Sequence, residues 1–255
     1  MSSFSLSGLW DYLTGGKGAP NRAPASPPSP ITGIDVSHHQ GQIAWPLVAQ
    51  AGITFAFAKA TEGATFVDPQ FAANWAGMKN AGIFRGAYHF FRPADPVDAQ
   101  VENFAGAVGA IEDSDLPPVL DLEEAKTPGG DEWDAIPGEQ RVPLALRWLR
   151  GIEGRLGRKP IIYVRRGFVA SMLPNPGPLA EYPLWVAHYT LEGAPAAPGV
   201  WPGWIFWQHS QQGSIAGVTG HVDLDRFNGT IDALPVLAAK SPAPARAAAA
   251  RNSPP

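Results

Sequence analysis

The chain has 255 residues, of which 45% are hydrophobic and 16% are charged, a composition that suits one large α/β domain or two small ones. Its 19 lysines and arginines against 23 aspartates and glutamates give a net charge of −4, which disfavours nucleic acid or an anionic membrane as the main partner. The absence of cysteine excludes disulfides, thiol nucleophiles and cysteine-based metal sites.

Both ends of the chain are poor in residues that could form a core. Residues 1–30 and 238–255 contain runs of Gly, Pro, Ala and Ser, and we expect disordered tails or linkers flanking one folded unit, residues 31–237. The start of the chain lacks a basic segment and reaches Asp11 before an apolar run has formed, so it is a poor secretory signal. No apolar run approaches the roughly 18 residues of a membrane helix, and we expect no integral membrane segment.

Eight short runs in the folded unit have the residue types and alternation of β-strands. They span residues 32–37, 54–61, 84–91, 118–123, 160–164, 183–189, 204–210 and 221–227.

Helical patterns separate the first five of these strands. Residues 45–50 predict a short helix, whereas Asp68–Pro69 and Asp95–Pro96 each predict an N-cap followed by proline at the first helical position. A third strong helix is expected over 144–156 and a short one over 167–173. The later connections are too rich in Gly and Pro for helices. We therefore predict an α/β fold, a TIM-like barrel of five βα units and three trailing strands, some of them antiparallel.

The stretch PPVLDLEEA (117–125) places two acids in a run otherwise built for burial. In a strand, successive side chains point to opposite faces, so Asp121 and Glu123 share one face. Glu124 points the other way, and we expect it to be solvated or to face a helix. Two carboxylates on one strand face are costly to bury, so they need a polar cavity, a charge partner or a catalytic role.

Polar residues at the strand ends are expected to converge on one pocket, because the carboxyl ends of barrel strands form the active face. The set is Asp35, Lys59, Tyr88, His89, Asp121, Glu123, Tyr163, His188, Tyr189 and Gln208, together with Asp223 if the last two strands form a hairpin. Repulsion among four carboxylates raises the pKa of at least one, with Lys59 as counter-charge, and a raised acid beside an ionised carboxylate suits glycoside hydrolysis.

Six segments, in order, resemble the glycoside hydrolase family 25 lysozymes, the Chalaropsis-type muramidases. They are GIDVSHHQG (33–41), FAFAKATEG (55–63), GAYHFF (86–91), PPVLDLE (117–123), PLWVAHY (183–189) and the WQHS and GHVDLDRFNG blocks within 207–229. The resemblance covers nearly all of residues 31–237. It implies a (β/α)5(β)3 barrel that hydrolyses the β-1,4 bond between N-acetylmuramic acid and N-acetylglucosamine in peptidoglycan, without metal or other cofactor.

The resemblance also implies roles for individual residues. Glu123 is the general acid, and Asp121 either positions the substrate's N-acetyl group as internal nucleophile or acts more directly, with retention of configuration. Asp35 and Asp223 tune pKa values and hold sugar hydroxyls. The substrate-binding positions are Tyr88, Lys59, Trp185, Tyr189 and Gln208. Peptidoglycan strands are the expected partner of a monomer acting on the cell wall, in the extracellular space or periplasm, by an export route left open.

Other interpretations of the acidic residues stay open. Asp121 and Glu123 could form structural ion pairs with Lys59 or an arginine, and Asp35 could cap the following turn. Asp223 is preferred to Asp225 as the site residue only because of the resemblance.

His38 and His39 depart from the pair usual in the family, and His209 replaces its commoner tyrosine. We expect the rings of His38 and His39 to point apart and hold no metal, because no third histidine lies at ligand spacing. The late tryptophans Trp185, Trp204 and Trp207 could be core residues or sugar platforms. A chitinase-like hydrolase and a non-catalytic glycan-binding barrel remain the alternative functions.

Overall fold

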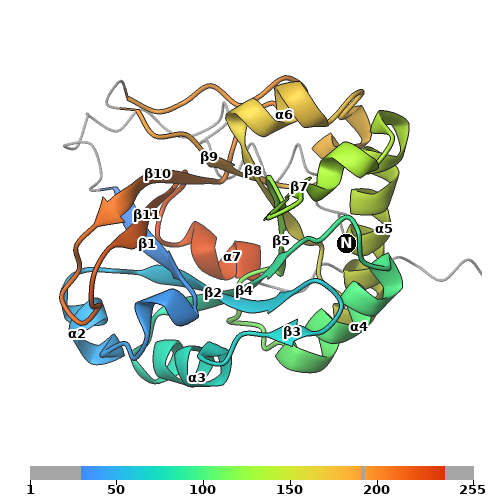
Figure 1. Cartoon of the computed structure of the whole chain (residues 1–255). Helices are drawn as coiled ribbons and strands as arrows, with labels where there is room; N and C mark the ends of the chain where they lie inside the picture. Colours follow the sequence, from blue (N-terminus) through green and yellow to red (C-terminus); the bar gives the residue numbers. More distant parts are fainter. Residues whose placement is uncertain (1–29, 191–192, 239–255) are drawn as a thin grey trace, which may run out of the picture.

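The computed structural model describes residues 30–190 and 193–238. Eight strands close into a barrel, because β1 pairs with β2 on one side and with β11 on the other (Figure 1). Around the barrel these strands are β1 (Ile31–Val36), β2 (Phe55–Glu62), β4 (Phe84–Phe90), β5 (Val119–Leu122), β8 (Ile161–Arg165), β9 (Leu184–Ala187), β10 (Phe206–Gly213) and β11 (Val222–Phe227). Seven strands run parallel, and β11 is antiparallel to both neighbours.

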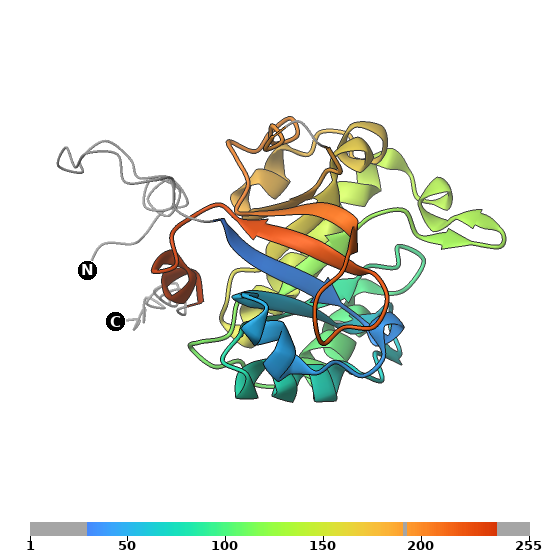
Figure 2. The same ribbon diagram turned by 90° about the vertical axis from the view of Figure 1, so that its left-hand side faces the viewer.

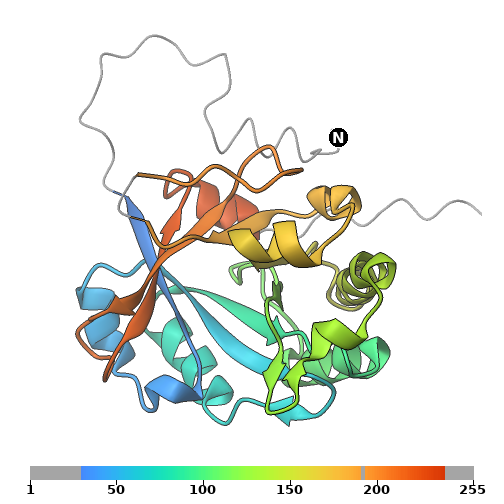
Figure 3. The same ribbon diagram turned by 45° about the horizontal axis from the view of Figure 1, so that its top comes forward.

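Helices follow the first five barrel strands and lie outside them (Figure 3). They are α2 (Trp45–Gln50), α3 (Phe71–Asn80), α4 (Val97–Val108), α5 (Gly138–Leu156) and α6 (Arg166–Met172). In the part of the chain that the structure describes, no helix lies between β9, β10 and β11, as their Gly- and Pro-rich connections predict; the 3-10 helix of this region precedes β9. The expected barrel of five βα units and three trailing strands is therefore confirmed.

Smaller elements complete the fold. They are the 3-10 helices η1 (His38–Gln40), η2 (Glu132–Ala135) and η3 (Gly177–Glu181), the short strands β3 (Phe66–Val67), β6 (Lys126–Thr127) and β7 (Gly130–Asp131), and helix α7 (Ala233–Ala238). Helix α7 lies at the end of the barrel where β1 begins, and the β6–β7 hairpin projects from the opposite end (Figure 2). One end is thus plugged and the other carries the loops.

Aromatic side chains fill the plugged half of the barrel interior. Phe55, Phe57, Trp185 and Phe206 are buried there and contact one another. Room for these rings comes from glycine, since a Cβ at Gly86 would lie 2.3 Å from the Phe57 ring. A second apolar layer lies between the strands and the outer helices. The strands are thus buried on both faces, which explains their near-continuous apolar sequence.

Three helix starts differ from the sequence prediction. Helix α5 begins at Gly138, six residues before the predicted start, and contains Pro143. A proline inside a helix loses one backbone hydrogen bond; here the Arg141 side chain helps to fix the first turn by donating to the carbonyls of Ile136 and Trp133.

The two predicted Asp caps are also wrong. The N-caps are Gln70 for α3 and Pro96 for α4, neither with a side-chain capping bond. The Asp68 carboxylate instead accepts hydrogen bonds from His38 as well as from the Gln70 backbone, and Asp95 accepts from the Ala64 backbone. Asp68 therefore joins the start of α3 to η1, and Asp95 joins the start of α4 to the turn between β2 and β3.

The tails predicted over 1–30 and 238–255 lie almost wholly outside the described residues. Within residues 30–190 and 193–238, no helix is long and apolar enough to cross a membrane.

Candidate active site

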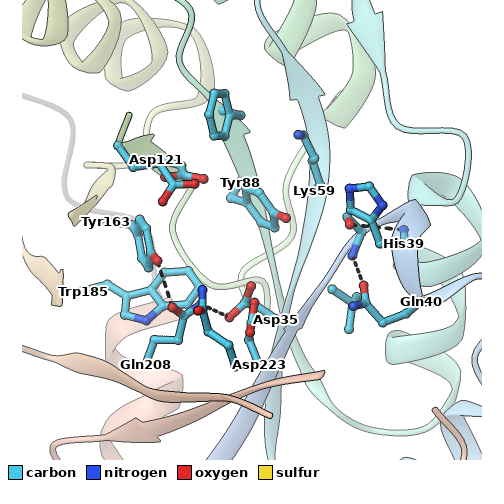
Figure 4. A pocket seen from close by; sticks show the side chains of 15 residues that line it. Asp35, His39, Gln40, Lys59, Tyr88, Asp121, Tyr163, Trp185, Gln208 and Asp223 are labelled. Carbon is cyan, nitrogen blue, oxygen red and sulfur yellow. Dashed lines mark hydrogen bonds between the residues drawn. The ribbon is translucent and has the colours of Figure 1, made fainter. Parts of the chain in front are cut away.

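Strand β5 delivers the two acids of the PPVLDLEEA stretch to a cavity at the loop end of the barrel. Asp121 lies near the end of β5 and Glu123 directly follows it. The cavity has a volume of about 250 Å³ (Figure 4). Its lining residues are Asp35, Val36, Ser37, His39, Gln40, Lys59, Tyr88, Phe90, Asp121, Glu123, Tyr163, Trp185, Gln208, Gln211 and Asp223. All four predicted acids therefore meet in one cavity.

Three residues of the predicted rim do not line the cavity. Tyr189 is an exposed residue whose hydroxyl donates to the cavity-lining Gln208, at 2.6 Å from Oε1. His188 contributes its backbone to the β9–β10 region. His89 points to the opposite side of the sheet, with Nδ1 2.7 Å from Thr61 Oγ1 and Nε2 2.9 Å from Gln100 Oε1. Because His89 follows the inward-facing Tyr88, strand alternation turns it outward, so its placement at the rim was wrong.

The Glu123 carboxyl has the properties of a general acid. Burial raises its pKa to about 7, although the nearby positive charge of Arg165 opposes that shift. Burial, and then repulsion from Glu123, raise the pKa of Asp121 well above its usual value. Asp121 Oδ1 is buried and has no hydrogen-bond partner in the described part of the chain. At neutral pH this pair can therefore hold a proton for transfer beside an oxygen free to accept a hydrogen bond.

Asp121 and Glu123 form no ion pair with any residue that the structure describes. Among the described residues, Lys59 Nζ contacts Glu62 Oε2 at 2.5 Å, and Arg165 contacts Glu124 at 3.3 Å. Glu124 is thus partly buried and paired, as its opposite orientation on the strand allows. The ion-pair interpretation of Asp121 and Glu123 is wrong for both residues.

Gln208 holds Asp35 on the far side of the cavity. Its Oε1 accepts from Tyr163 and Tyr189, at 2.8 Å and 2.6 Å. Its amide nitrogen must then face Asp35, and Nε2 donates to Asp35 Oδ2 at 2.7 Å (Figure 4). Asp35 does not cap the following turn, since Ser37 does so.

Asp223 and Asp225 occupy different depths beside Asp35. Asp223 pairs with Asp35 across β1 and β11 and lines the cavity, and burial raises its pKa to about 6. Asp225 is buried below the cavity and accepts from Trp185 Nε1 at 3.0 Å. Burial, followed by repulsion from Asp225 and Asp223, raises the pKa of Asp35 well above its usual value. Asp223 is thus the cavity-facing member, and Asp225 lies behind the cavity.

The histidine pair lies at the cavity edge on η1. The ring centroids of His38 and His39 are 4.1 Å apart, so the expectation that they point apart was wrong. The 3-10 turn, rather than an extended strand, brings the rings together. His38 Nδ1 lies 2.7 Å from the buried carboxylate of Asp68. In the described residues, no group of three or more His, Asp or Glu side chains has an arrangement that could hold a metal ion.

The late tryptophans divide between the two layers. Trp185 lies inside the barrel beneath the cavity. Trp207 belongs to the outer layer and contacts Trp204 with ring centroids 5.9 Å apart, so these two are core residues rather than sugar platforms. The alternation along β10, in which Phe206 and Gln208 point inward, gives this outward orientation.

Sequence reasoning missed Glu62, Phe90 and Gln211. Phe90 and Gln211 line the cavity, and Glu62 binds Lys59 at its edge. Phe90 could have been predicted, because it lies two residues after the inward-facing Tyr88 on the same strand and so shares its face. Glu62 and Gln211 follow strand irregularities, which simple alternation cannot locate.

The comparison with known proteins agrees with this geometry. The model of the family described as "Glycosyl hydrolases family 25" matches residues 34–218. The chain belongs to this family. The resemblance of the six sequence segments is thereby confirmed, and the protein is a glycoside hydrolase.

Relatives of this family 25 enzyme include named lysozymes. Lysozyme M1 of Streptomyces globisporus is 39% identical over 214 residues, which cover 82% of this chain and 72% of that protein. The N,O-diacetylmuramidase of Chalaropsis is 28% identical over 220 residues, covering 82% of this chain and 99% of the relative.

Solved structures agree with the barrel. The bacterial lysozyme from Streptomyces coelicolor superimposes with a TM-score of 0.77 and 38% identity, over 83% of this chain and 98% of that chain. The muramidase from Acremonium alcalophilum gives a TM-score of 0.74 and 30% identity, over 82% of this chain and 98% of that one.

Proposed function

We propose that this enzyme hydrolyses the β-1,4 bond between N-acetylmuramic acid and N-acetylglucosamine in peptidoglycan. The observation that carries the proposal is Glu123, a carboxyl with a pKa of about 7 that faces a cavity shared with Asp121, Asp35 and Asp223. Relatives named as lysozymes and muramidases support this substrate. A carboxyl group with a raised pKa beside further carboxylates is the arrangement that glycoside hydrolysis requires.

In the proposed reaction, Glu123 gives its proton to the leaving glycosidic oxygen as the bond to the anomeric carbon breaks. The carbonyl oxygen of the substrate's own acetamido group forms a bond to that carbon, and Asp121 Oδ1 accepts the acetamido N–H. Water then attacks the anomeric carbon and breaks its bond to the acetamido oxygen, and Glu123 takes up a proton of that water; two displacements on the same carbon retain configuration. The unpartnered Asp121 Oδ1 supports this role for Asp121.

The remaining cavity residues are proposed to bind the sugar. Asp35 and Asp223 would accept hydrogen bonds from sugar hydroxyls, while Tyr88 and Trp185 offer ring surfaces. Lys59 lies on β2, next to Tyr88 on the neighbouring strand β4, and Gln208 with Tyr189 orients Asp35. No cofactor is needed in this scheme, and we propose that the catalytic barrel over residues 31–237 acts on the cell wall as a monomer.

Mass spectrometry of reaction products tests this proposal. Purified peptidoglycan is digested, the new reducing ends are reduced with borohydride, and the fragments are sequenced. Ends carrying reduced N-acetylmuramic acid are expected. Reduced N-acetylglucosamine ends would contradict the muramidase proposal. Digestion of chitin but not peptidoglycan would instead indicate a chitinase-like hydrolase.

Glu123→Gln is the matched control, because it keeps the size of the side chain and removes the transferable proton. A Glu123→Gln protein that binds wall fragments without releasing reducing ends is expected. If the unaltered protein also binds wall fragments and releases no ends, the barrel is a glycan-binding module.

A further inference from the structure

A β-bulge in β2 turns an additional acid toward the active-site cavity. Lys59 pairs with Tyr88 of β4, but the next paired residue is Thr61, opposite His89, so Ala60 is the extra residue. In a regular strand, residues three apart point to opposite faces. The bulge resets this alternation, which turns Thr61 outward to His89 and brings Glu62 to the same side as Lys59.

Glu62 joins Lys59 to a chain of alternating charges. Lys59 Nζ contacts Glu62 Oε2 at 2.5 Å, and Glu62 Oε1 is 3.3 Å from Arg92 Nη1. The other guanidinium nitrogen of Arg92 contacts Glu132 Oε1. Each carboxylate oxygen of Glu62 therefore contacts a cation, Lys59 on the cavity wall and Arg92 in the loop after β4. Glu132 anchors the far end on η2, which follows the β6–β7 hairpin.

The ammonium of Lys59 is enclosed on its other sides. Its side chain is 10% exposed and lies near two rings, 4.9 Å from the Phe90 centroid and 5.8 Å from that of Phe66. These contacts hold the ammonium against the β2 wall, in the same cavity as Glu123.

Charged and titratable groups from every neighbouring element act on this cavity. These groups are Asp121, Glu123 and Glu124 from β5 and its continuation; Arg165 and Tyr163 from β8; Tyr88 from β4; Asp35 and Asp223 from β1 and β11; His39 from η1; and Lys59, Glu62, Arg92 and Glu132 from β2 and the adjoining loops. Arg165 is paired with Glu124. Glu62 contacts Lys59 and can therefore control the position of that cation.

We propose that Glu62 is a positioning residue, which holds the Lys59 ammonium on the β2 wall and away from Glu123, so that Glu123 keeps its proton for catalysis. The inference rests on the proposed role of Glu123 as general acid. Without the Glu62 carboxylate, Lys59 can approach Asp121 and Glu123, because both carboxyls line the same cavity and neither has an ion-pair partner among residues 30–190 and 193–238. A cation closer to a carboxyl favours its ionised form.

The direction of the expected effect follows from this geometry. A general acid must be protonated, so activity falls as pH rises through its pKa. Glu62→Gln should therefore move the alkaline limb of the kcat/KM profile to lower pH, by about one unit. Lys59→Met should move the limb to higher pH. In a Lys59→Met background, the additional Glu62→Gln change should produce no downward shift, because its effect acts through Lys59.

A control variant at the opposite end of the barrel makes the comparison specific. Glu112 also binds a lysine, Lys79, at 2.5 Å. Glu112→Gln is therefore the same chemical change at a surface ion pair and should leave the pH profile unchanged. Glu62→Ala serves as a second variant at the site and should shift the alkaline limb in the same direction as Glu62→Gln.

The decisive experiment measures kcat/KM from pH 4 to 9 on solubilised peptidoglycan, and the titration of the Glu123 carboxyl by 13C NMR in the full chain. A downward shift in both readouts for Glu62→Gln and Glu62→Ala supports the inference. Profiles superimposable on that of the unaltered enzyme would overturn it, as would an equal shift in the Lys59→Met background. An unaltered enzyme without hydrolase activity would instead refute the proposed function.

Discussion

Gln208 of β10 donates a hydrogen bond from Nε2 to Oδ2 of Asp35 on β1 at 2.7 Å, although the two residues are 173 positions apart in the chain. The orientation of this amide is set by Tyr163 and Tyr189, which both donate to Oε1. One buried amide therefore connects two aromatic hydroxyls to a carboxyl that lines the cavity. A buried amide with three hydrogen-bond partners contributes to stability as well as to the geometry of the cavity.

Replacement of Gln208 by leucine should destabilise the fold. The change leaves Asp35 and two hydroxyls without a buried partner, and we expect the free energy of unfolding to fall by about 1–3 kcal/mol. Urea denaturation followed by tryptophan fluorescence measures the effect. Gln212→Leu, at an exposed position of the same strand, is the control and should change stability by less than about 0.5 kcal/mol. Equal stability of the two variants would contradict this account of Gln208.

Asp225→Asn should stabilise the protein increasingly as pH rises above about 4. Burial raises the pKa of Asp225 well above its usual value, so the folded state is favoured while Asp225 is protonated and loses that advantage as pH rises toward the raised pKa. Each pH unit in this window costs about 1.4 kcal/mol. Asparagine avoids this cost and can still accept from Trp185 Nε1.

Thermal unfolding at pH 4, 6 and 8 tests this linkage. The difference in melting temperature between Asp225→Asn and the unaltered protein should grow with pH. Asp98→Asn, at an exposed surface ion pair, is the control. A difference that is constant or shrinks with pH would rule out the assigned direction of the Asp225 pKa shift.

Gly86→Ala should distort the aromatic plug of the barrel. The added methyl would lie 2.3 Å from the Phe57 ring, and the expected cost in unfolding free energy is about 1–3 kcal/mol. Gly106→Ala places the same methyl in open space on α4 and should stabilise by about 0.5–1 kcal/mol. Chemical denaturation of both variants measures their free energies of unfolding. Changes of the same sign in the two variants would argue against the close approach of Gly86 to the Phe57 ring.

The rate of glycan hydrolysis should decline at alkaline pH. Glu123 has a pKa of about 7, and only its protonated form can donate to the leaving group. Initial rates at low substrate concentration should therefore fall about tenfold per pH unit well above pH 7. Activity that stays constant to pH 9 would show that no acid with this pKa takes part.

Much of this arrangement could be predicted because it depends on alternation along single strands. Asp121 and Glu123 share a face through their spacing alone, and the antiparallel β11 brings Asp223 to the same end as Asp35. All eight strands could be located from their residue types. Their closure into a barrel followed from the order of strands and helices.

The parts that could not be predicted depend on irregular backbone or on distant packing. The bulge at Ala60 places Glu62 beside Lys59, and no residue in FAFAKATEG marks its position. The turn at η1 brings the ring centroids of His38 and His39 to 4.1 Å from one another, whereas an extended chain would separate them. Asp68 and Asp95 have the sequence of helix caps, but loop amides or the His38 ring compete for their carboxylates. The orientations of these two carboxylates therefore depend on hydrogen-bond partners that are distant in the sequence.

The most direct test of the central claim compares Glu123→Gln with Glu124→Gln. Glu123 faces the cavity, whereas its sequence neighbour Glu124 pairs with Arg165. Release of reducing ends from purified peptidoglycan should fall by about 10²–10⁴-fold for Glu123→Gln, because the transferable proton is lost. Glu124→Gln should retain activity within severalfold of the unaltered enzyme. Nearly full activity in Glu123→Gln, in a protein with an unchanged melting temperature, would contradict the account.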